Sequence, residues 1–178
     1  SEKVFGVTPD IITCAKGITS GYMPLGAVLF SDKLLNDLKN DSALFFHGYT
    51  YSGHPACCAA ALKNIEIIKR DKILEHVQNI EPYFHQQLKK LYDLPIVGDI
   101  RGKGLMAGIE CVINKDSKEA LVLDKAIGSR IDEESLKLGL IIRPLYHICV
   151  LSPALIISKN QIDTLVNKLY LAIKNTIK

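Results

Sequence analysis

The stretch that decides the fold of this chain is TPDIITCAKGITSGYMPLGA, residues 8–27. Its β-type apolar run over 11–15 predicts a buried strand, and Lys16 stands at the exit of that strand. A loop rich in glycine and hydroxyl side chains then leads to a second predicted strand, 26–30. Lysine is rarely buried, because moving an ionised amine into apolar surroundings is costly. Two interpretations of Lys16 follow: its amine reaches solvent, or its amine is there to react.

The composition of the chain is that of an ordinary globular protein. Its 178 residues, 48% hydrophobic and 23% charged, suffice for one large or two small domains with a filled core. The 22 basic and 19 acidic residues are interspersed, which argues against a nucleic-acid partner. The richest apolar run is interrupted by polar residues and prolines such as Arg143 and Pro153, and no signal peptide is evident. We therefore expect neither nucleic acid nor a membrane among its partners.

The cysteines and the opening residues carry two further expectations. The five cysteines show no C-x-x-C spacing and are odd in number, which predicts reduced, mostly buried thiols in a cytoplasmic protein. The opening SEKVFGVTPD has no initiating methionine, no helix cap and no apolar period. Because this is typical of a loop already in progress, we expect the chain to be part of a longer protein.

The apolar pattern along the rest of the chain predicts helices and strands, and those of residues 95–178 are expected to form a small α/β layer structure. The expected elements are a helix over 32–39 capped by Ser31, a helix from Pro55 to 70, a helix capped by Asp71 and kinked or broken at Pro82, strands within 96–113, a helix over 121–138 followed by Gly139, strands within 140–145 and 147–152, and a helix from Lys159. The core faces of the two middle helices are expected at Leu62, Ile65 and Ile68, and at Leu74, Val77, Ile80, Phe84, Leu88 and Leu91.

A second stretch with a chemical pattern is HGYTYSGHP, residues 47–55. Its glycines free the backbone, Tyr49 and Thr50 offer hydroxyls, and the amides of the helix that follows favour an anion. Phosphate binding is the functional interpretation and a well-capped turn is the structural one; the residues alone favour the turn. His47 and His54 have no third ligand of matching spacing, so we expect no metal site.

Two other patterns have competing interpretations. The segment GKGLMAG, 102–108, looks like a dinucleotide fingerprint, but a strand is predicted after it instead of a helix, which favours a bend between strands. Arg143 stands between two apolar strands, where a guanidinium needs an anionic partner or a cavity. A structural ion pair and a clamp for a substrate carboxylate both meet that need, and spacing does not decide between them.

Taken together, four stretches resemble one family, the class III aminotransferases, which are pyridoxal 5′-phosphate enzymes of fold type I. TPDIITCAKGITSGYMPLGAV is similar to that family's lysine segment, HGYTYSGHPACCAAAL to its second signature, VGDIRGKGLMAGIE to the start of its C-terminal domain, and GLIIRPLYHICVLSPALII to its last signature block. The resemblance covers essentially the whole chain in the family's order. It implies an α/β fold in which residues 1–75 form the C-terminal part of the large cofactor-binding domain and 76–178 the small C-terminal domain.

Carried onto this sequence, the resemblance implies roles for four residues. Lys16 matches the catalytic lysine that bonds the aldehyde of pyridoxal 5′-phosphate. Tyr49 and Thr50 match positions that reach the cofactor phosphate of the neighbouring subunit, which implies a homodimer with shared active sites. Arg143 falls where many members carry an arginine that holds a substrate carboxylate. The loop over 19–27 is most like the ω-amino acid–pyruvate enzymes, so the implied reaction moves an amino group from an amine or ω-amino acid to a keto acid such as pyruvate.

The resemblance also implies parts that this chain lacks. In the family, an upstream portion supplies a phosphate-binding loop, an aromatic that stacks on the cofactor ring and an acid that pairs with the ring nitrogen. We therefore expect the chain to be inactive alone. A competing interpretation is a non-catalytic α/β module that binds a nucleotide or a protein partner through residues 102–108. The presence of Lys16, Thr50 and Arg143 argues against it, because a binding module has no need of all three.

Overall fold

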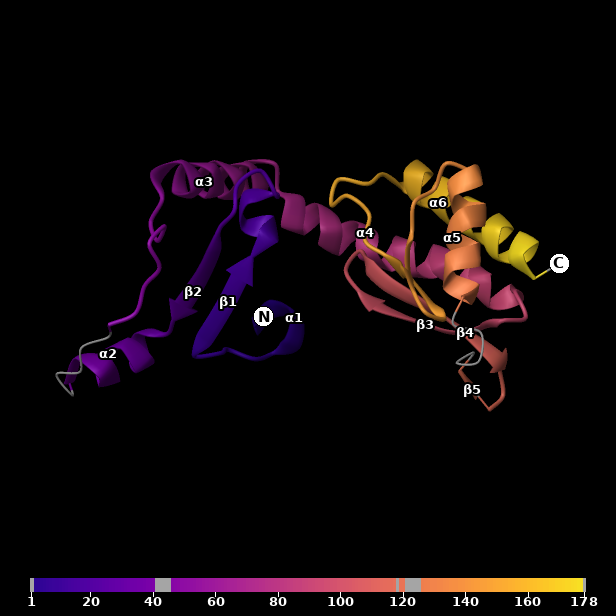
Figure 1. Ribbon diagram of the computed structural model, residues 1–178, viewed down its shortest axis with the longest axis horizontal. Coiled ribbons are helices and arrows are strands. Elements are labelled where there is room, and N and C mark those ends of the chain that lie inside the picture. The colour runs from indigo at the N-terminus through magenta and orange to yellow at the C-terminus, as the bar shows by residue number, and fades with distance from the viewer. Residues whose placement is uncertain (1, 41–45, 118, 121–125, 178) are drawn as a thin grey trace. The chain divides into compact units, whose positions relative to one another are not determined.

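The computed structural model describes residues 2–40, 46–117, 119–120 and 126–177 (Figure 1). The chain divides into two compact units, residues 1–71 and 72–178. Both units mix helices with strands, which confirms the predicted α/β class. Within the described ranges, no helix combines the length and the apolar character needed to cross a bilayer.

The first unit is built from one strand pair and several helices. Its described elements are α1 (Glu2–Phe5), β1 (Ile11–Ala15), the short 3-10 helix η1 (Lys16–Thr19), β2 (Gly26–Phe30), α2 (Asp32–Asn40) and α3 (Pro55–Arg70). The strands β1 and β2 pair antiparallel over their full length, as predicted around Lys16. The hydroxyl of Ser31 accepts a hydrogen bond from the N–H of Leu34 (3.3 Å), which confirms the expected cap of α2. Pro55 opens α3, also as expected.

The strand before Lys16 is not buried within this unit, and that expectation was wrong for the isolated chain. Ile11 on β1 is 51% exposed and Val28 on β2 is 55% exposed. In the described part of the chain, β1 has β2 as its single strand neighbour. Among the residues of this unit whose burial the structure describes, the buried ones are Thr19, Cys57 and Ala61. An apolar run indicates that a strand is suited to burial. It does not show whether the residues that would bury the strand belong to the same unit.

The second unit is a five-stranded antiparallel sheet with helices packed against it (Figure 1). Its described elements are α4 (Ile73–Leu88), the 3-10 helix η2 (Lys89–Asp93), β3 (Val97–Lys103), β4 (Met106–Asn114), β5 (Glu119–Ala120), α5 (Ile127–Lys137), β6 (Arg143–Leu145), β7 (Ile148–Leu151) and α6 (Lys159–Thr176). The strand order is β3-β4-β7-β6, and β5 adds to β4. These elements confirm the strands predicted within 96–113, 140–145 and 147–152 and the closing helix.

The core of the second unit lies between one face of its sheet and the helices α4, α5 and α6. Fully or almost fully buried residues come from all of these elements: Phe84 and Leu88, Ile131, Ile162, Val166, Leu169 and Ile173, with Ile109, Cys149 and Leu151 from the sheet. Burial of a large aliphatic or aromatic side chain stabilises a fold by about 1.5–3 kcal/mol. This unit therefore carries most of the apolar burial that the described chain contains.

Capping contacts close two helix ends in this unit, and the one at Gly139 was predicted from the sequence. Gly139 adopts φ +70° directly after α5, where its N–H donates to the carbonyl of Leu136 (2.9 Å). A capping box joins Ser158 and Gln161 at the start of α6. The predicted beginning of α5, at residues 121–125, lies outside the described residues.

Three expectations about the helix after α3 were wrong. Asp71 does not cap α4: Lys72 is the N-cap residue, and the Asp71 carboxylate is held by the guanidinium of Arg70 (2.7 Å). The helix continues through Pro82 without a break. Leu74, placed in the core stripe, is 65% exposed, whereas the later stripe positions are buried or half-buried. The first turn of an amphipathic helix often extends beyond the core, and periodicity alone does not show where the core begins.

Candidate active site

Lys16 is the first residue of η1, at the end of β1, and its backbone is in the left-handed region with φ +52°. This conformation is uncommon for a residue with a Cβ. Its side chain is exposed and, within the described part of the chain, forms no ion pair or hydrogen bond. Beside it, Gly17 has no atom within 4 Å of the place where a Cβ would stand. The amine of Lys16 is therefore accessible, with open space next to it.

The loop that carries Lys16 is closed by its own hydrogen bonds. The N–H of Gly21 donates to the carbonyl of Lys16 (3.3 Å). Thr19 is almost completely buried, and its hydroxyl donates to the carbonyl of Met23 (2.6 Å). Ser20 is a second residue with positive φ, at +50°. Two left-handed residues with a short hydrogen-bonded turn between them hold the chain in a tight reversal after Lys16.

The helix α3 packs against this loop, next to η1 (Figure 1). Its contact face carries Cys57 and Ala61, which are buried, and Asn64, which is half-buried. The Nδ2 of Asn64 donates to the carbonyls of Gly17 (2.9 Å) and Ile18 (3.1 Å). Its Oδ1 accepts a hydrogen bond from the hydroxyl of Ser20 (2.6 Å). One side chain of α3 thus binds three of the four residues that follow Lys16.

Neither Asn64 nor Thr19 was predicted from the sequence, and the core face predicted for α3 is not the one that packs against the loop. The apolar pattern placed that face at Leu62, Ile65 and Ile68, but Leu62 is 69% exposed and the face in use is that of Cys57 and Ala61. Small side chains let the loop backbone come close to the helix, which larger ones would prevent. The available signal was the spacing of residues 57, 61 and 64, which places a polar side chain on the face with small residues.

Tyr49 and Thr50 lie in the exposed segment before α3. The segment forms a turn in which the N–H of Tyr49 donates to the hydroxyl of Ser52 (3.0 Å), and the N–H of Ser52 donates to the carbonyl of Tyr49 (3.0 Å). The structural interpretation, a capped turn, is therefore present. It is made by Ser52, so the hydroxyl of Thr50 remains available for a ligand. The first turn of α3 contains no acidic residue that would oppose an anion.

The segment 102–108 lies in a tight connection between β3 and β4, with Gly104 at φ +60°. The strand β4 follows it directly, and no helix begins there. This confirms the interpretation of its glycines as a bend between strands. A dinucleotide fingerprint needs a helix N-terminus at this place to bind the pyrophosphate.

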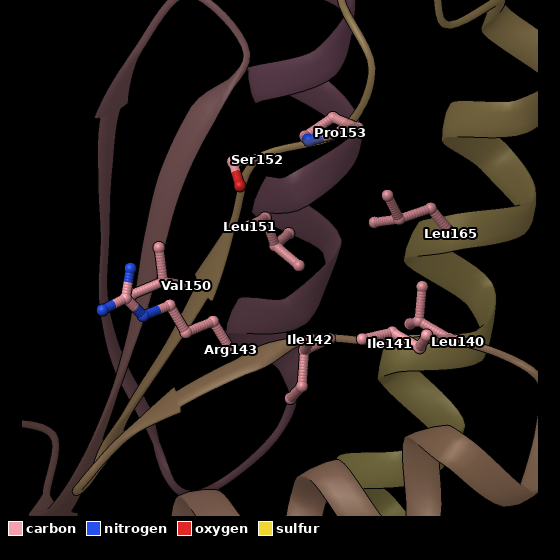
Figure 2. A pocket seen from close by; sticks show the side chains of 9 residues that line it. All are labelled: Leu140, Ile141, Ile142, Arg143, Val150, Leu151, Ser152, Pro153 and Leu165. Atoms are coloured by element: carbon pink, nitrogen blue, oxygen red, sulfur yellow. The ribbon is translucent and has the colours of Figure 1, made fainter. Parts of the chain in front are cut away.

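Arg143 begins β6 in the second unit, and Val150 on β7 is its partner in register. Its side chain is exposed and, among the residues described, has no acidic partner. It lines a cavity of about 380 Å³ whose other walls are apolar apart from Ser152. Figure 2 shows the guanidinium extending past Val150, away from Leu165 on the far side of the cavity. A structural ion pair, one of the two interpretations of Arg143, has no partner in the described chain.

A second arginine on the same face of the sheet, Arg101, differs in this respect. Registers across β3, β4, β7 and β6 place Arg101 in one row with Gly108, Val150 and Arg143. The Arg101 guanidinium binds Asp99 (2.9 Å) and Glu110. Its hydrogen bond holds the pKa of the Glu110 carboxyl below the usual value. Arg101 is therefore neutralised inside the unit, and Arg143 is the arginine of this row that is free to bind an external carboxylate.

Comparison with known proteins places these features in a wider group. The profile of a family described as aminotransferase class-III matches residues 1–173. A putrescine–pyruvate aminotransferase of Pseudomonas aeruginosa is 41% identical over 166 residues, which are 93% of this chain and 36% of that protein. Other curated matches include gamma-aminobutyrate transaminases of plants.

Solved structures agree with these matches. An (S)-enantioselective omega-transaminase from Thermomicrobium roseum superposes with a TM-score of 0.90 at 40% identity, over 98% of this chain and 39% of that one. An amine transaminase from an uncultivated Pseudomonas species, solved in its PLP-bound internal aldimine form, gives a TM-score of 0.90 at 36% identity, over 96% of this chain and 39% of that one. The chain thus spans well under half the length of the relatives it matches.

Proposed function

Because this chain belongs to the class-III aminotransferase family, we propose that the whole protein is a pyridoxal 5′-phosphate-dependent transaminase. It moves an amino group from an amine or ω-amino acid to a keto acid, with pyruvate as the acceptor named for the Pseudomonas aeruginosa relative. The observation that carries the proposal is Lys16: an exposed, unpaired amine on a left-handed residue at a strand end, with open space at Gly17. Backbone conformations of this kind cluster at active sites.

The residues present fit two ends of the cofactor. A primary amine is the group that binds an aldehyde, and the Lys16 amine is accessible. The free Thr50 hydroxyl and the N-terminal amides of α3 suit a phosphate. When bound, the cofactor supplies an electron sink for the bond that breaks at the substrate carbon. Lys16 would hold the cofactor covalently, and its Nζ, once the incoming amine has taken its place, would remove the proton from the substrate carbon that bears nitrogen and pass it on to the cofactor, first as general base and then as general acid.

Arg143 is proposed to bind the carboxylate of the acceptor. Its guanidinium is exposed and without a partner in the described chain, and the cavity beside it is mostly apolar. A planar guanidinium binds a carboxylate through two parallel hydrogen bonds, and apolar walls strengthen that attraction. A neutral amine donor has no group for this site, so Arg143 contributes to only one of the two half-reactions.

The remainder of the proposed protein completes the site. We propose a fold type I architecture in which residues 1–75 belong to the large domain and 76–178 form the small domain, with the ring-nitrogen acid, the stacking aromatic and the second phosphate loop supplied from outside this chain. The exposed apolar faces of β1 and β2 support this, because such faces suit strands that are covered in a larger sheet. We further propose a cytoplasmic homodimer in which Tyr49 and Thr50 reach the phosphate held by the other subunit. The 178-residue chain alone is then inactive.

The test of Lys16 uses the whole protein and pyridoxal 5′-phosphate. After borohydride reduction and digestion, mass spectrometry is expected to find the label on the Lys16 peptide, and Lys16→Ala is expected to abolish transamination. Lys63→Ala is the matched control, because Lys63 is an exposed lysine of the same unit paired with Glu66. An active Lys16→Ala protein, or label scattered over surface lysines, would contradict the assignment.

The same assay separates the role of Arg143. Arg143→Ala is expected to raise the KM for keto acids by about 10- to 100-fold, the effect of losing a charged hydrogen-bonded contact, while the KM for simple amines changes little. Equal changes for both substrates would remove Arg143 from this role. Size-exclusion chromatography and light scattering of the whole protein test the dimer.

A further inference from the structure

We propose that Asn64 is a positioning residue for Lys16. It holds the backbone that leaves Lys16, and thereby the directions open to the Lys16 amine. The inference rests on the proposed function, in which Lys16 is the residue that binds the cofactor and moves the proton. In the described part of the chain, the side-chain hydrogen bonds of Asn64 go to the loop: to the carbonyls of Gly17 and Ile18 and to the hydroxyl of Ser20.

The loop that Asn64 contacts has a strained backbone. Lys16 and Ser20 both have positive φ, at +52° and +50°. A non-glycine residue in this region is strained, and the conformation persists where the surroundings determine it strongly. The Asn64 side chain forms three hydrogen bonds with this loop. Its partners are Ser20, one of the two strained residues, and Gly17 and Ile18, which lie between them. These hydrogen bonds are the contacts from outside the loop best placed to hold it.

The side-chain carboxamide of Asn64 matches the groups that the loop presents to it. A carboxamide has one group that donates and one that accepts, and only its NH2 group serves two carbonyls at once. In Asn64 that group meets the carbonyls of Gly17 and Ile18, and the oxygen is left for Ser20. The orientation of the amide is therefore determined by its partners. A carboxylate of the same shape keeps the contact with Ser20 and loses both donor contacts.

Asn64 lies in the interior of α3, where asparagine is intrinsically unfavourable. The reason is that its side chain competes for backbone hydrogen bonds. Asn64 stands in the middle of the 16-residue helix Pro55–Arg70 and is turned outward to the loop. Cys57 and Ala61, small and buried on the same face, allow the approach. The helix gives up some intrinsic stability at this position and gains a fixed loop.

A fixed loop matters for the reaction because Lys16 acts at two places. Its Nζ must bond the cofactor and then, released, reach the substrate carbon to move a proton. A misplacement of about 1 Å in a reacting group costs roughly 100-fold in rate. Loss of the Asn64 contacts is therefore expected to lower kcat and to leave substrate binding, which depends on other residues, nearly unchanged.

The experiment uses the whole protein loaded with pyridoxal 5′-phosphate and the variants Asn64→Asp, Asn64→Leu, Ser20→Ala and Lys63→Ala. The two Asn64 variants remove the donor contacts, and we expect kcat to fall roughly 10- to 100-fold with each KM within about two-fold. The kinetic isotope effect with a donor deuterated at its amino-bearing carbon should rise, because proton transfer by Lys16 becomes limiting. Borohydride should also trap less cofactor on the Lys16 peptide at equal cofactor concentration. Ser20→Ala keeps both donor contacts and is expected to lose much less, and Lys63→Ala nothing.

Three results would overturn the positioning role. The first is wild-type kcat, isotope effect and Lys16 labelling in both Asn64 variants. The second is a kcat loss matched by a loss of folded protein in thermal unfolding, with an unchanged isotope effect. If neither variant folds, Asn64→Ser replaces the amide with a hydroxyl that has one donor, and wild-type kcat in that variant is the third. Activity or labelling that survives Lys16→Ala would instead defeat the proposed function, so the two failures are distinguishable.

Discussion

In the second unit, side chains such as Phe84, Leu88 and Ile131 are fully enclosed between a sheet and three helices, whereas in the first unit Ile11 and Val28 leave about half of their surface exposed. Both units come from sequences with equally clear apolar patterns. The apolar pattern of a sequence thus shows which residues are suited to a hydrophobic core. Whether they are buried depends on how many helices and strands pack around them. In the first unit the backbone ladder joins β1 to β2, and the side chain of Asn64 joins α3 to the lysine loop through hydrogen bonds.

The largest expected effect tests this difference by truncating one apolar side chain in each unit. Phe84→Ala in the 178-residue chain is expected to cost about 3–5 kcal/mol, because Phe84 is completely buried and its removal leaves a cavity. Val28→Ala is expected to cost less than about 0.5 kcal/mol, the usual result for an exposed position. Chemical denaturation followed by circular dichroism measures both. A loss of similar size for Val28→Ala would show that the first unit has a core of its own.

Glycine substitutions sharpen the comparison at smaller energy. A Cβ added to Gly102 on β3 would stand 2.1 Å from the carbonyl oxygen of Met106, a backbone atom that cannot move aside alone. Gly102→Ala is therefore expected to destabilise the second unit by about 1–3 kcal/mol, as overpacking does. Gly17→Ala meets open space and should leave stability almost unchanged. Thermal unfolding of the two variants gives the answer, and equal losses would contradict the contrast between a closed and an open unit.

The smallest expected effect is on the loss of folding stability at acidic pH. The Arg101 hydrogen bond lowers the pKa of Glu110, so this carboxylate contributes stability above its unfolded pKa, near 4.5, and the contribution is lost as pH falls through the lower folded value. Glu110→Gln should therefore weaken the loss of stability on acidification below pH 4.5, by about 1 kcal/mol. Glu66 in the first unit, whose pKa is lowered by Lys63, is fully exposed, and Glu66→Gln should change the acid profile less. A larger change for Glu66→Gln would reverse the comparison.

The sequence predicted those parts of the fold that depend on neighbours along the chain. The strands around Lys16, the cap of α2 at Ser31, the start of α3 at Pro55 and the glycine after α5 all carry signals within a few residues. Asp71 failed as a cap because a neighbouring guanidinium, Arg70, competes for its carboxylate.

The residues proposed for the candidate site could be named from the sequence and the resemblance, and their roles stay predictions, whereas the arrangement around Lys16 could not be derived in this way. Lys16, Tyr49, Thr50 and Arg143 were selected by type and order, and the structure shows each to be exposed. Asn64 was missed because its role depends on contacts 44 to 47 positions away in the chain. Sequence patterns report periodicity within one element, and such a contact between two elements leaves no period.

The free cysteines differ in burial, and their rates of alkylation therefore report when the core of the second unit opens. Cys111 and Cys149 are buried in the core of the second unit, and a hydrogen bond with the Cys111 thiol, together with burial, raises the pKa of Cys149. Since the thiolate is the form that reacts with alkylating reagents, these two sulfurs are modified only when that core opens. Cys14 and Cys58, half-buried in the first unit, need no such opening. Timed alkylation read by mass spectrometry thus records the opening of the second unit, with Cys14 and Cys58 as internal references that react without it.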